Sequence, residues 1–299
     1  MTDLYYTFNK FLRQKFDNRK VRKIPINAGF SCPNKDGVIS RQGCVFCDHY
    51  GSGPIKTFTL PIEDQIKQFI QGHQGIKYLA YYQAHCNTHA PLDTLKRKYE
   101  IIFKFEDIVG LSIGTRPDSI ADEVYPLLET LDRRTYLMVE LGLQSTHKKS
   151  LDFLNRNHTY DQFLDCFQKL KSRGIDVVVH LIVGIPGETK EDMLATVKEM
   201  NRLQPAGVKL HLFHVLKDTP LLDMYQQKKF TLLEKDEYID AIVSMLESLS
   251  PEIVIHRLTG ERDREIFAAP QWALDKMDTI QSIRKRMMDL GTYQGKKKI

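Results

Sequence analysis

The sequence has no long apolar run and no apolar core near its amino terminus. Its longest apolar stretches, such as residues 177–185, contain histidine or glycine and are far shorter than the roughly 20 residues that a membrane span needs. The amino-terminal segment MTDLYYTFNKFLRQKF lacks the continuous apolar stretch of a secretion signal. We therefore expect a soluble protein of the cytoplasm that makes no contact with a membrane.

Cysteine is sparse, with five residues in a chain of 299. In the cytoplasm an odd set of this size is more often reduced, metal-bound or buried than paired in disulfides. Three of the five, Cys32, Cys44 and Cys47, fall in the stretch CPNKDGVISRQGCVFC, with gaps of eleven and two residues. A Cys-x-x-Cys pair presents two thiolates to one metal centre, and a third cysteine returns to it across a glycine-containing loop.

A fourth cysteine is missing from this stretch, which separates two interpretations. Structural zinc is held by four ligands, and Cys32, Cys44 and Cys47 together with His49 could supply them. Alternatively, three thiolates leave one position of a metal centre open for another molecule. The cysteines alone leave both interpretations open.

Internal repeats and low-complexity linkers are also absent, and the formal net charge is only +5. A content of 42% hydrophobic and 27% charged residues suits one large α/β domain, with or without an appendage. We divide the chain into an amino-terminal helix and basic segment (1–23), a core (24–216) and a carboxy-terminal extension (217–299).

Within the core, helical and strand patterns alternate in about six β-α units. The strands are too uniformly apolar for a half-exposed antiparallel sheet, so we expect a parallel sheet covered by helices. Periodicity alone does not choose between a partial barrel and a doubly wound sheet. The expected strands are 24–28, 77–83, 108–113, 136–143, 175–185 and 207–216, and the expected helices are 62–71, 92–104, 121–131, 160–173 and 190–203.

Polar or glycine-containing motifs follow five of these strands: the cysteine loop, QAHCNTHA, GTRPDS, LQS and GIPGET. Ligands gather at the carboxyl ends of parallel strands, so one rim is predicted to carry the chemistry.

The order of these motifs, with ELGLQS and HLIVGIPGET on the fourth and fifth strands, resembles the radical S-adenosylmethionine enzymes. The similarity is greatest to the branch related to the catalytic subunit of Elongator, and to small bacterial proteins with CPN-x-DG and GC-x-FC motifs. The resemblance implies a partial (β/α)6 barrel of TIM type. It also implies a [4Fe-4S] cluster bound by Cys32, Cys44 and Cys47, whose open iron binds S-adenosylmethionine.

In that family the reduced cluster cleaves S-adenosylmethionine to a 5′-deoxyadenosyl radical, and the electron comes from a donor of flavodoxin or ferredoxin type. By the resemblance, further residues contact the cosubstrate. Phe46 lies near the adenine, Gln83 or its neighbour Asn87 takes the place of the acid that holds the methionine amino group, and Arg156 reaches the methionine carboxylate. The remaining candidates are Thr115, Arg116, Gln144, His180 and Gly184.

Several of these residues also have an ordinary structural interpretation. Arg156 could pair with a surface carboxylate, Gln144 could end a strand, and His180 could be a hydrogen-bonded core histidine. Cys166 shares a helical face with aromatic residues and is predicted to be core. Cys86 is predicted to pack as a bystander.

The carboxy-terminal extension carries basic residues that could contact an RNA backbone: Arg284, Lys285, Arg286, Lys296, Lys297 and Lys298. The Elongator branch modifies the wobble uridine of transfer RNA. The resemblance thus implies a tRNA substrate and, most specifically, maturation of a carboxymethylaminomethyl group on that uridine toward aminomethyl. Radical chemistry on a small molecule or peptide, and a non-catalytic metal-bound RNA-binding or scaffold protein, are the alternatives.

Overall fold

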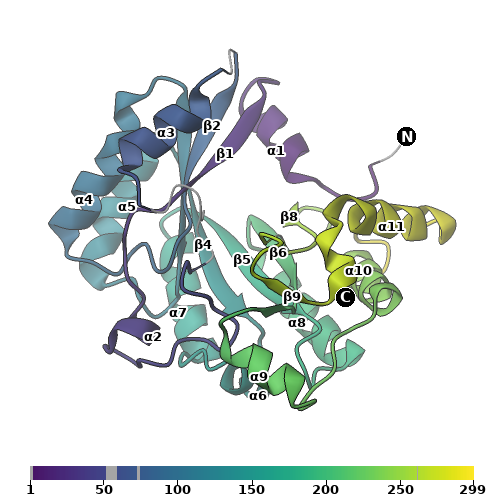
Figure 1. The fold of residues 1–299 in the computed structure, drawn as a ribbon. Helices are drawn as coiled ribbons and strands as arrows, with labels where there is room; N and C mark the ends of the chain where they lie inside the picture. The colour runs from purple at the N-terminus through teal and green to yellow at the C-terminus, as the bar shows by residue number, and fades with distance from the viewer. Residues whose placement is uncertain (1–2, 52–58, 73–74, 261) are drawn as a thin grey trace.

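The computed structural model describes residues 3–51, 59–72, 75–260 and 262–299, which form a curled sheet with helices on its outer face (Figure 1). Seven parallel strands follow one another in the order β1-β2-β3-β4-β5-β6-β8. A doubly wound sheet would reverse this order at a switch point, so the predicted partial barrel is confirmed. The strands are β1 (Val21–Ile26), β2 (Lys77–Tyr82), β3 (Ile108–Thr115), β4 (Tyr136–Gln144), β5 (Asp176–Val183), β6 (Gly207–Leu212) and β8 (Val254–Arg257).

The helices bury one apolar side against the sheet and begin at recognisable caps. Thr189 accepts a hydrogen bond from the Asp192 amide at the start of α8, as its sequence position predicts. Phe163 and Phe167 on α7 are buried against the sheet. The longer helices are α3 (Ile62–Ile70), α4 (Leu92–Glu100), α5 (Tyr125–Asp132), α7 (Tyr160–Lys171), α8 (Lys190–Leu203), α10 (Lys235–Ser248) and α11 (Lys276–Asp289), and the shorter ones are α2 (Pro33–Asp36), α6 (Lys148–Phe153) and α9 (Pro220–Gln226).

Two strands differ from expectation. β1 begins at Val21, three residues before the predicted start at residue 24, and thus includes Lys23 from the basic run. The predicted strand 207–216 divides into β6 and a short β7 (Val215–Leu216), which pairs antiparallel with β9 (Phe267–Ala269). In both places charged or polar side chains interrupt the apolar pattern that sequence reading relies on.

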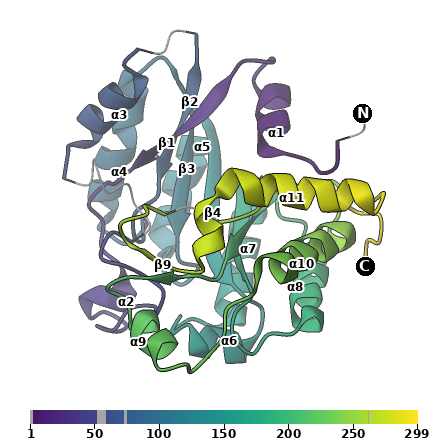
Figure 2. The same ribbon diagram turned by 45° about the vertical axis from the view of Figure 1, so that its right-hand side comes forward.

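The gap between the edge strands β1 and β8 is covered by α1 (Phe8–Lys15). The Phe8 ring stacks on His256 of β8 at 4.0 Å, and the Ile255 amide donates to the Tyr6 carbonyl at 2.8 Å. Gln294 ties both chain ends together, since its side-chain oxygen accepts from the Tyr6 amide at 2.8 Å and its own amide donates to the Leu4 carbonyl at 2.9 Å. Figure 2 shows the two termini on the same side of the molecule, near α10 and α11.

The basic carboxy-terminal residues divide into two groups. Arg286 on α11 pairs with Asp236 and Asp240 of α10, and Lys297 pairs with Glu247 at 2.8 Å. The Lys296 ammonium donates to the Gly291 carbonyl. All of the candidates except the half-buried Arg286 are exposed, Lys296 and Lys297 included. None of the helices in the described parts of the chain is long and apolar enough to cross a membrane.

Candidate active site

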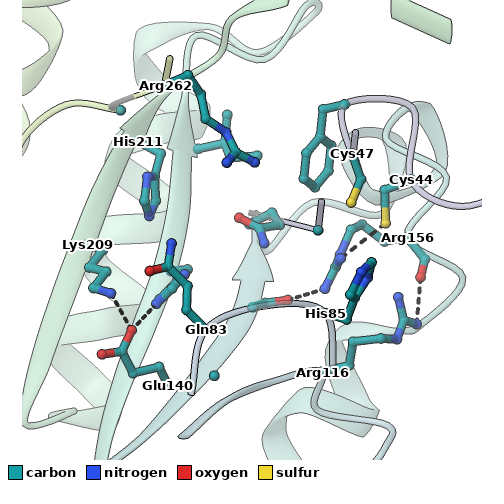
Figure 3. Close-up of a pocket in the computed structure, with 18 of the residues that line it drawn as sticks. Cys44, Cys47, Gln83, His85, Arg116, Glu140, Arg156, Lys209, His211 and Arg262 are labelled. Atoms are coloured by element: carbon teal, nitrogen blue, oxygen red, sulfur yellow. Dashed lines mark hydrogen bonds and ion pairs between the residues drawn. The ribbon is translucent and has the colours of Figure 1, made fainter. Parts of the chain in front are cut away.

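A cavity opens at the carboxyl ends of the strands, on the inner face of the curved sheet (Figure 3). Its lining brings together residues from the cysteine loop, from β2 to β6 and from the segment after β8. The sequence candidates that line it are Cys32, Cys44, Phe46, Cys47, Gln83, Thr115, Arg116, Gln144, Arg156 and His180.

The long first gap of the cysteine motif forms a folded loop. Cys32 precedes the short helix α2, which ends at Gly37 in the left-handed conformation, with φ of 101°. Asn34 on α2 is fully buried, and its side chain donates to the Asn155 carbonyl at 2.8 Å. The Asn155 side chain in turn donates to the Gly43 carbonyl at 2.6 Å. The loop is thereby held against the segment after α6, which keeps the three cysteines on one wall.

The Cys44 sulfur receives two hydrogen bonds, whereas burial disfavours the thiolate form of Cys32 and Cys47. The Cys44 sulfur accepts from Arg156 Nη1 at 3.2 Å and from Asn34 Nδ2 at 3.4 Å. Burial raises the pKa of Cys32 to about 12, and burial also raises the pKa of Cys47, against the opposing effect of nearby Lys35. A buried thiolate needs a positively charged partner. The iron ions of a [4Fe-4S] cluster would supply that charge, and cysteine thiolates are the ligands that hold such clusters.

In residues 3–51, 59–72, 75–260 and 262–299, no three side chains of histidine, cysteine, aspartate or glutamate are placed to hold one metal ion, and this applies to the three cysteines with or without His49. The arrangement of these side chains therefore does not distinguish a zinc site from an iron-sulfur cluster, and the choice depends on the family to which the chain belongs.

Arg116 and Arg156 form a cationic wall beside Cys44. Arg116 makes a bidentate pair with Asp118, at 2.9 and 2.6 Å, while its Nη1 is buried without a hydrogen-bond partner among the described residues. Arg156 is only 6% exposed, so it is not the surface residue that the structural interpretation assumed. An unused guanidinium donor next to the sulfurs fits the carboxylate of a bound cosubstrate.

β4 is shaped to bring Arg156 and Gln144 together. Arg156 Nη2 donates to the Gly142 carbonyl at 2.5 Å, and Gln144 has a φ of 80° where the pairing with β5 shifts. A Cβ at Gly142 would lie 3.1 Å from the Gln144 amide nitrogen and 3.2 Å from Arg156 Nη2. Glycine at this position therefore permits the close approach of both side chains.

Two predicted cosubstrate contacts do not line the cavity. Asn87 is fully buried, and its amide nitrogen donates to the carbonyls of Tyr82 and Gly114, so it joins β2 to β3. Gly184 has a φ of 84°, and a Cβ there would meet the side chain of Leu233 at 2.7 Å. Because residue 184 is glycine, the Leu233 side chain can pack against its backbone.

Cys86 and Cys166 are buried, and Cys86 lies beside the cysteine loop, where its amide donates to the Ser31 carbonyl at 3.1 Å. The Cys86 sulfur lies 3.0 Å from the Thr115 hydroxyl and is fully buried. Cys166 is 2% exposed within the core that α7 forms. Both therefore occupy packed positions.

The interior of the cavity holds a charged network that the sequence motifs did not predict. Glu140 on β4 is buried, and one of its oxygens accepts from Lys23 and from the Ser112 hydroxyl at 2.7 Å. The other oxygen accepts from Lys209 and from His180 Nε2 at 2.7 Å. One carboxylate thus receives hydrogen bonds from residues on β1, β3, β5 and β6.

Burial alone would raise the pKa of Glu140, yet Lys209 and Lys23 hold it well below its usual range. Burial lowers the pKa of Lys209 to about 7 and that of His180 to about 4. His180 is therefore neutral near pH 7. It is both a hydrogen-bonded interior histidine and a wall of the cavity.

Other lining residues missed by sequence reasoning are His211, Arg257 and Arg262. Arg262 pairs with Asp48 at 3.2 Å, next to the cysteine loop.

The sequence does contain a signal for the Glu140 network, because Glu140 and Lys209 are charged residues within otherwise apolar strands. Lone buried charges are costly, so each such residue predicts a partner on a neighbouring strand.

Several buried histidines make the fold sensitive to acid. Burial lowers the pKa of His158 to about 3 and that of His214 to about 4. Below the ordinary value of 6.5, the unfolded chain binds protons that the folded chain does not. Stability is therefore fully present above pH 6.5 and falls toward pH 4, by up to about 1.4 kcal/mol per pH unit for each histidine.

We expect the midpoint of anaerobic urea unfolding to fall between pH 7.5 and 5.5, and His214→Asn to make that decline shallower. A decline of equal slope in the variant would show that His214 does not contribute.

Residues 36–200 match the Radical SAM superfamily, and residues 205–289 match the Radical SAM C-terminal domain. The first match spans more than half of the chain, and the protein belongs to the Radical SAM superfamily. Its cofactors are accordingly a [4Fe-4S] cluster and S-adenosylmethionine.

The protein YtqA of Bacillus subtilis is 38% identical over 299 residues, which span 98% of this chain and 92% of YtqA. A tRNA uridine(34) acetyltransferase of Methanocaldococcus jannaschii is 31% identical over 150 residues, 49% of this chain and 27% of that relative. The structure of Methanocaldococcus infernus Elp3 with an amino-terminal deletion superposes with a TM-score of 0.68 at 18% identity, covering 92% of this chain and 64% of that one. At this identity the structural likeness concerns the fold.

Proposed function

We propose that this protein is a radical S-adenosylmethionine enzyme of the cytoplasm that modifies tRNA at the 5-substituent of the wobble uridine. The proposed reaction is maturation of a carboxymethylaminomethyl group on that uridine toward aminomethyl. The similarity to a tRNA uridine(34) acetyltransferase over 150 residues supports a tRNA substrate.

The observation that carries this proposal is a single cavity with two distinct polar ends. The three cysteines lie at its rim, and the Glu140 network lies on its inner wall. Gln144, beside the rim, is four residues beyond Glu140 on the same strand, a separation of about 13 Å at 3.3 Å per residue. A base turned out of an RNA loop could enter this space and reach a reactive centre that is shielded from water.

The cluster and its cosubstrate, when bound, supply a radical able to remove a hydrogen atom from an unactivated carbon. The chain's own residues bind and orient. Cys32, Cys44 and Cys47 would hold the cluster, while Arg116 and Arg156 would hold the methionine carboxylate. The remaining proposed cosubstrate contacts are Phe46, Gln83, Thr115, Gln144 and His180.

Two kinds of partner complete the proposal. The proposed contacts for tRNA phosphates are Arg284, Lys285, Arg286, Lys296, Lys297 and Lys298. A flavodoxin or ferredoxin type of protein would supply the electron. Both contacts depend on salt concentration, because exposed charges are screened by ions.

Nucleoside mass spectrometry of tRNA from a deletion strain tests the substrate. We expect carboxymethylaminomethyluridine to accumulate and its aminomethyl derivatives to disappear, with restoration by the wild-type gene but not by a Cys44→Ala variant. An unchanged profile of wobble-uridine modification would contradict the proposed function, and radical chemistry on a small molecule or peptide would then remain.

A further inference from the structure

The inner wall of the cavity carries more positive than negative charge. Lys23 and Lys209 share the single carboxylate of Glu140, and both lie over the Tyr81 ring, at 4.7 and 4.4 Å from its centre. Arg257 on β8 is the pairing neighbour of Lys209 on β6. Two ammonium groups therefore share one carboxylate, and a third basic side chain lies on the neighbouring strand.

Arg257 is half-buried, and its side chain lines the cavity. His211 lies two residues after Lys209 on the same strand face, and its Nε2 is buried without a partner in the described part of the chain. Figure 3 shows Lys209 and His211 side by side on this wall. Unused polar groups buried beside a cavity indicate a ligand that completes their hydrogen bonds.

This surplus is separate from the positive charge near the cysteines. Arg116 and Arg156 lie at the rim, where the carboxylate of S-adenosylmethionine would be held. Arg262 is paired with Asp48. S-adenosylmethionine has only one carboxylate, so the anion that matches the inner surplus has to come from the substrate.

We propose that Lys209, Arg257 and His211 form a subsite for a carboxylate group of the substrate. The proposal rests on the proposed function, in which the carboxymethylaminomethyl group of the uridine ends in such a carboxylate. Burial, opposed by Glu140 and reinforced by Lys23 and Arg257, lowers the pKa of Lys209 to about 7, which indicates that the site has too few anions of its own. A bound carboxylate would supply the missing negative charge.

The subsite would also favour release of the product. The substrate arm carries a carboxylate that the cations attract. The product arm ends in an amine that is protonated near neutral pH and is repelled by the same cations. Release of the product is therefore favoured by the charges that bind the substrate.

The test compares two substrates with the holoenzyme: tRNA carrying the carboxymethylaminomethyl group, and the same tRNA with that carboxylate converted to a carboxamide. We expect wild-type kcat/KM to favour the carboxylate by about 100-fold. Arg257→Gln should lower kcat/KM on the carboxylate by about 30-fold, mainly through KM, and on the carboxamide by no more than about threefold. Arg257→Lys should retain most of the preference because it keeps the charge.

Arg22→Gln is the matched control, since it removes an exposed strand arginine that lies outside the cavity. Arg22→Gln should leave iron content, cleavage of S-adenosylmethionine and kcat/KM on both substrates unchanged. Equal use of both substrates by the wild type would overturn the proposal. So would an equal loss on both substrates in Arg257→Gln, because that result indicates a structural role.

A binding measurement separates this proposal from the proposed function. N-methylglycine, which has the amine and carboxylate of the substituent, should raise the thermal midpoint of the holoenzyme, whereas Arg257→Gln should abolish that rise. Inorganic phosphate in a parallel titration distinguishes a carboxylate subsite from a general anion site. If a deletion strain has unchanged tRNA and N-methylglycine still binds through Arg257, the wobble-uridine function fails and the carboxylate subsite stands. Absence of N-methylglycine binding, or stronger binding of phosphate, overturns the subsite.

Discussion

Replacing Cys44 by alanine should reduce cluster-dependent cleavage of S-adenosylmethionine by at least about 1,000-fold, because loss of one of three thiolates removes the means of holding the cluster. Cys44 is 6% exposed and is the cysteine whose sulfur receives hydrogen bonds from both Arg156 and Asn34. Iron and sulfide content after anaerobic reconstitution, together with 5′-deoxyadenosine formed under strong reductant, measure the effect.

The chain offers an internal control for this experiment. Cys166→Ala removes a thiol that is packed in the core beside α7, so iron content and cosubstrate cleavage should stay near wild type. Full cluster content in Cys44→Ala, or its loss in Cys166→Ala, would refute the assignment of Cys32, Cys44 and Cys47 as ligands.

Replacing Glu140 by alanine should lower the free energy of unfolding by about 3–5 kcal/mol, because Lys23 and Lys209 would then be buried without a counter-charge. Anaerobic urea unfolding at pH 7.5 measures the loss. Glu100→Ala is the matched control: its carboxylate pairs with Arg134 on the surface, where both side chains are more than a third exposed, and it should cost less than about 1 kcal/mol.

A second substitution shows whether the loss arises from uncompensated charge. Glu140→Ala combined with Lys209→Met should recover part of the stability, since one buried cation is removed together with its partner. Additive losses in the double variant would instead mean that the two residues stabilise the fold independently.

The succession of strands and helices, and the position of the cysteine loop at their carboxyl ends, could be predicted because they depend on local patterns. Alternation of apolar runs identifies elements within about ten residues of sequence. The inner network could not be read in this way, because the partners of Glu140 are Lys23, His180 and Lys209, at separations of 117, 40 and 69 residues. Whether these side chains come into contact depends on the curvature of the sheet.

Two of the predicted cosubstrate contacts, Asn87 and Gly184, are not among the residues that line the cavity, for a related reason. Asn87 and Gly184 occupy sequence positions next to strand ends, but side-chain direction and packing decide which groups reach the cavity. Asn87 turns toward backbone carbonyls of β2 and β3, and Leu233 fills the space beside Gly184. Arg257 lies on a strand outside the expected core, and β8 nevertheless completes the cavity wall.

The contacts that cover the gap between β1 and β8 join residues that are far apart in the sequence. α1 precedes β1 in the chain, but the strand against which α1 packs ends at Arg257, and the glutamine that joins Leu4 and Tyr6 is Gln294. Tyr6 and Gln294 are 288 residues apart in the sequence, so this edge of the barrel cannot close before Gln294 has been synthesised.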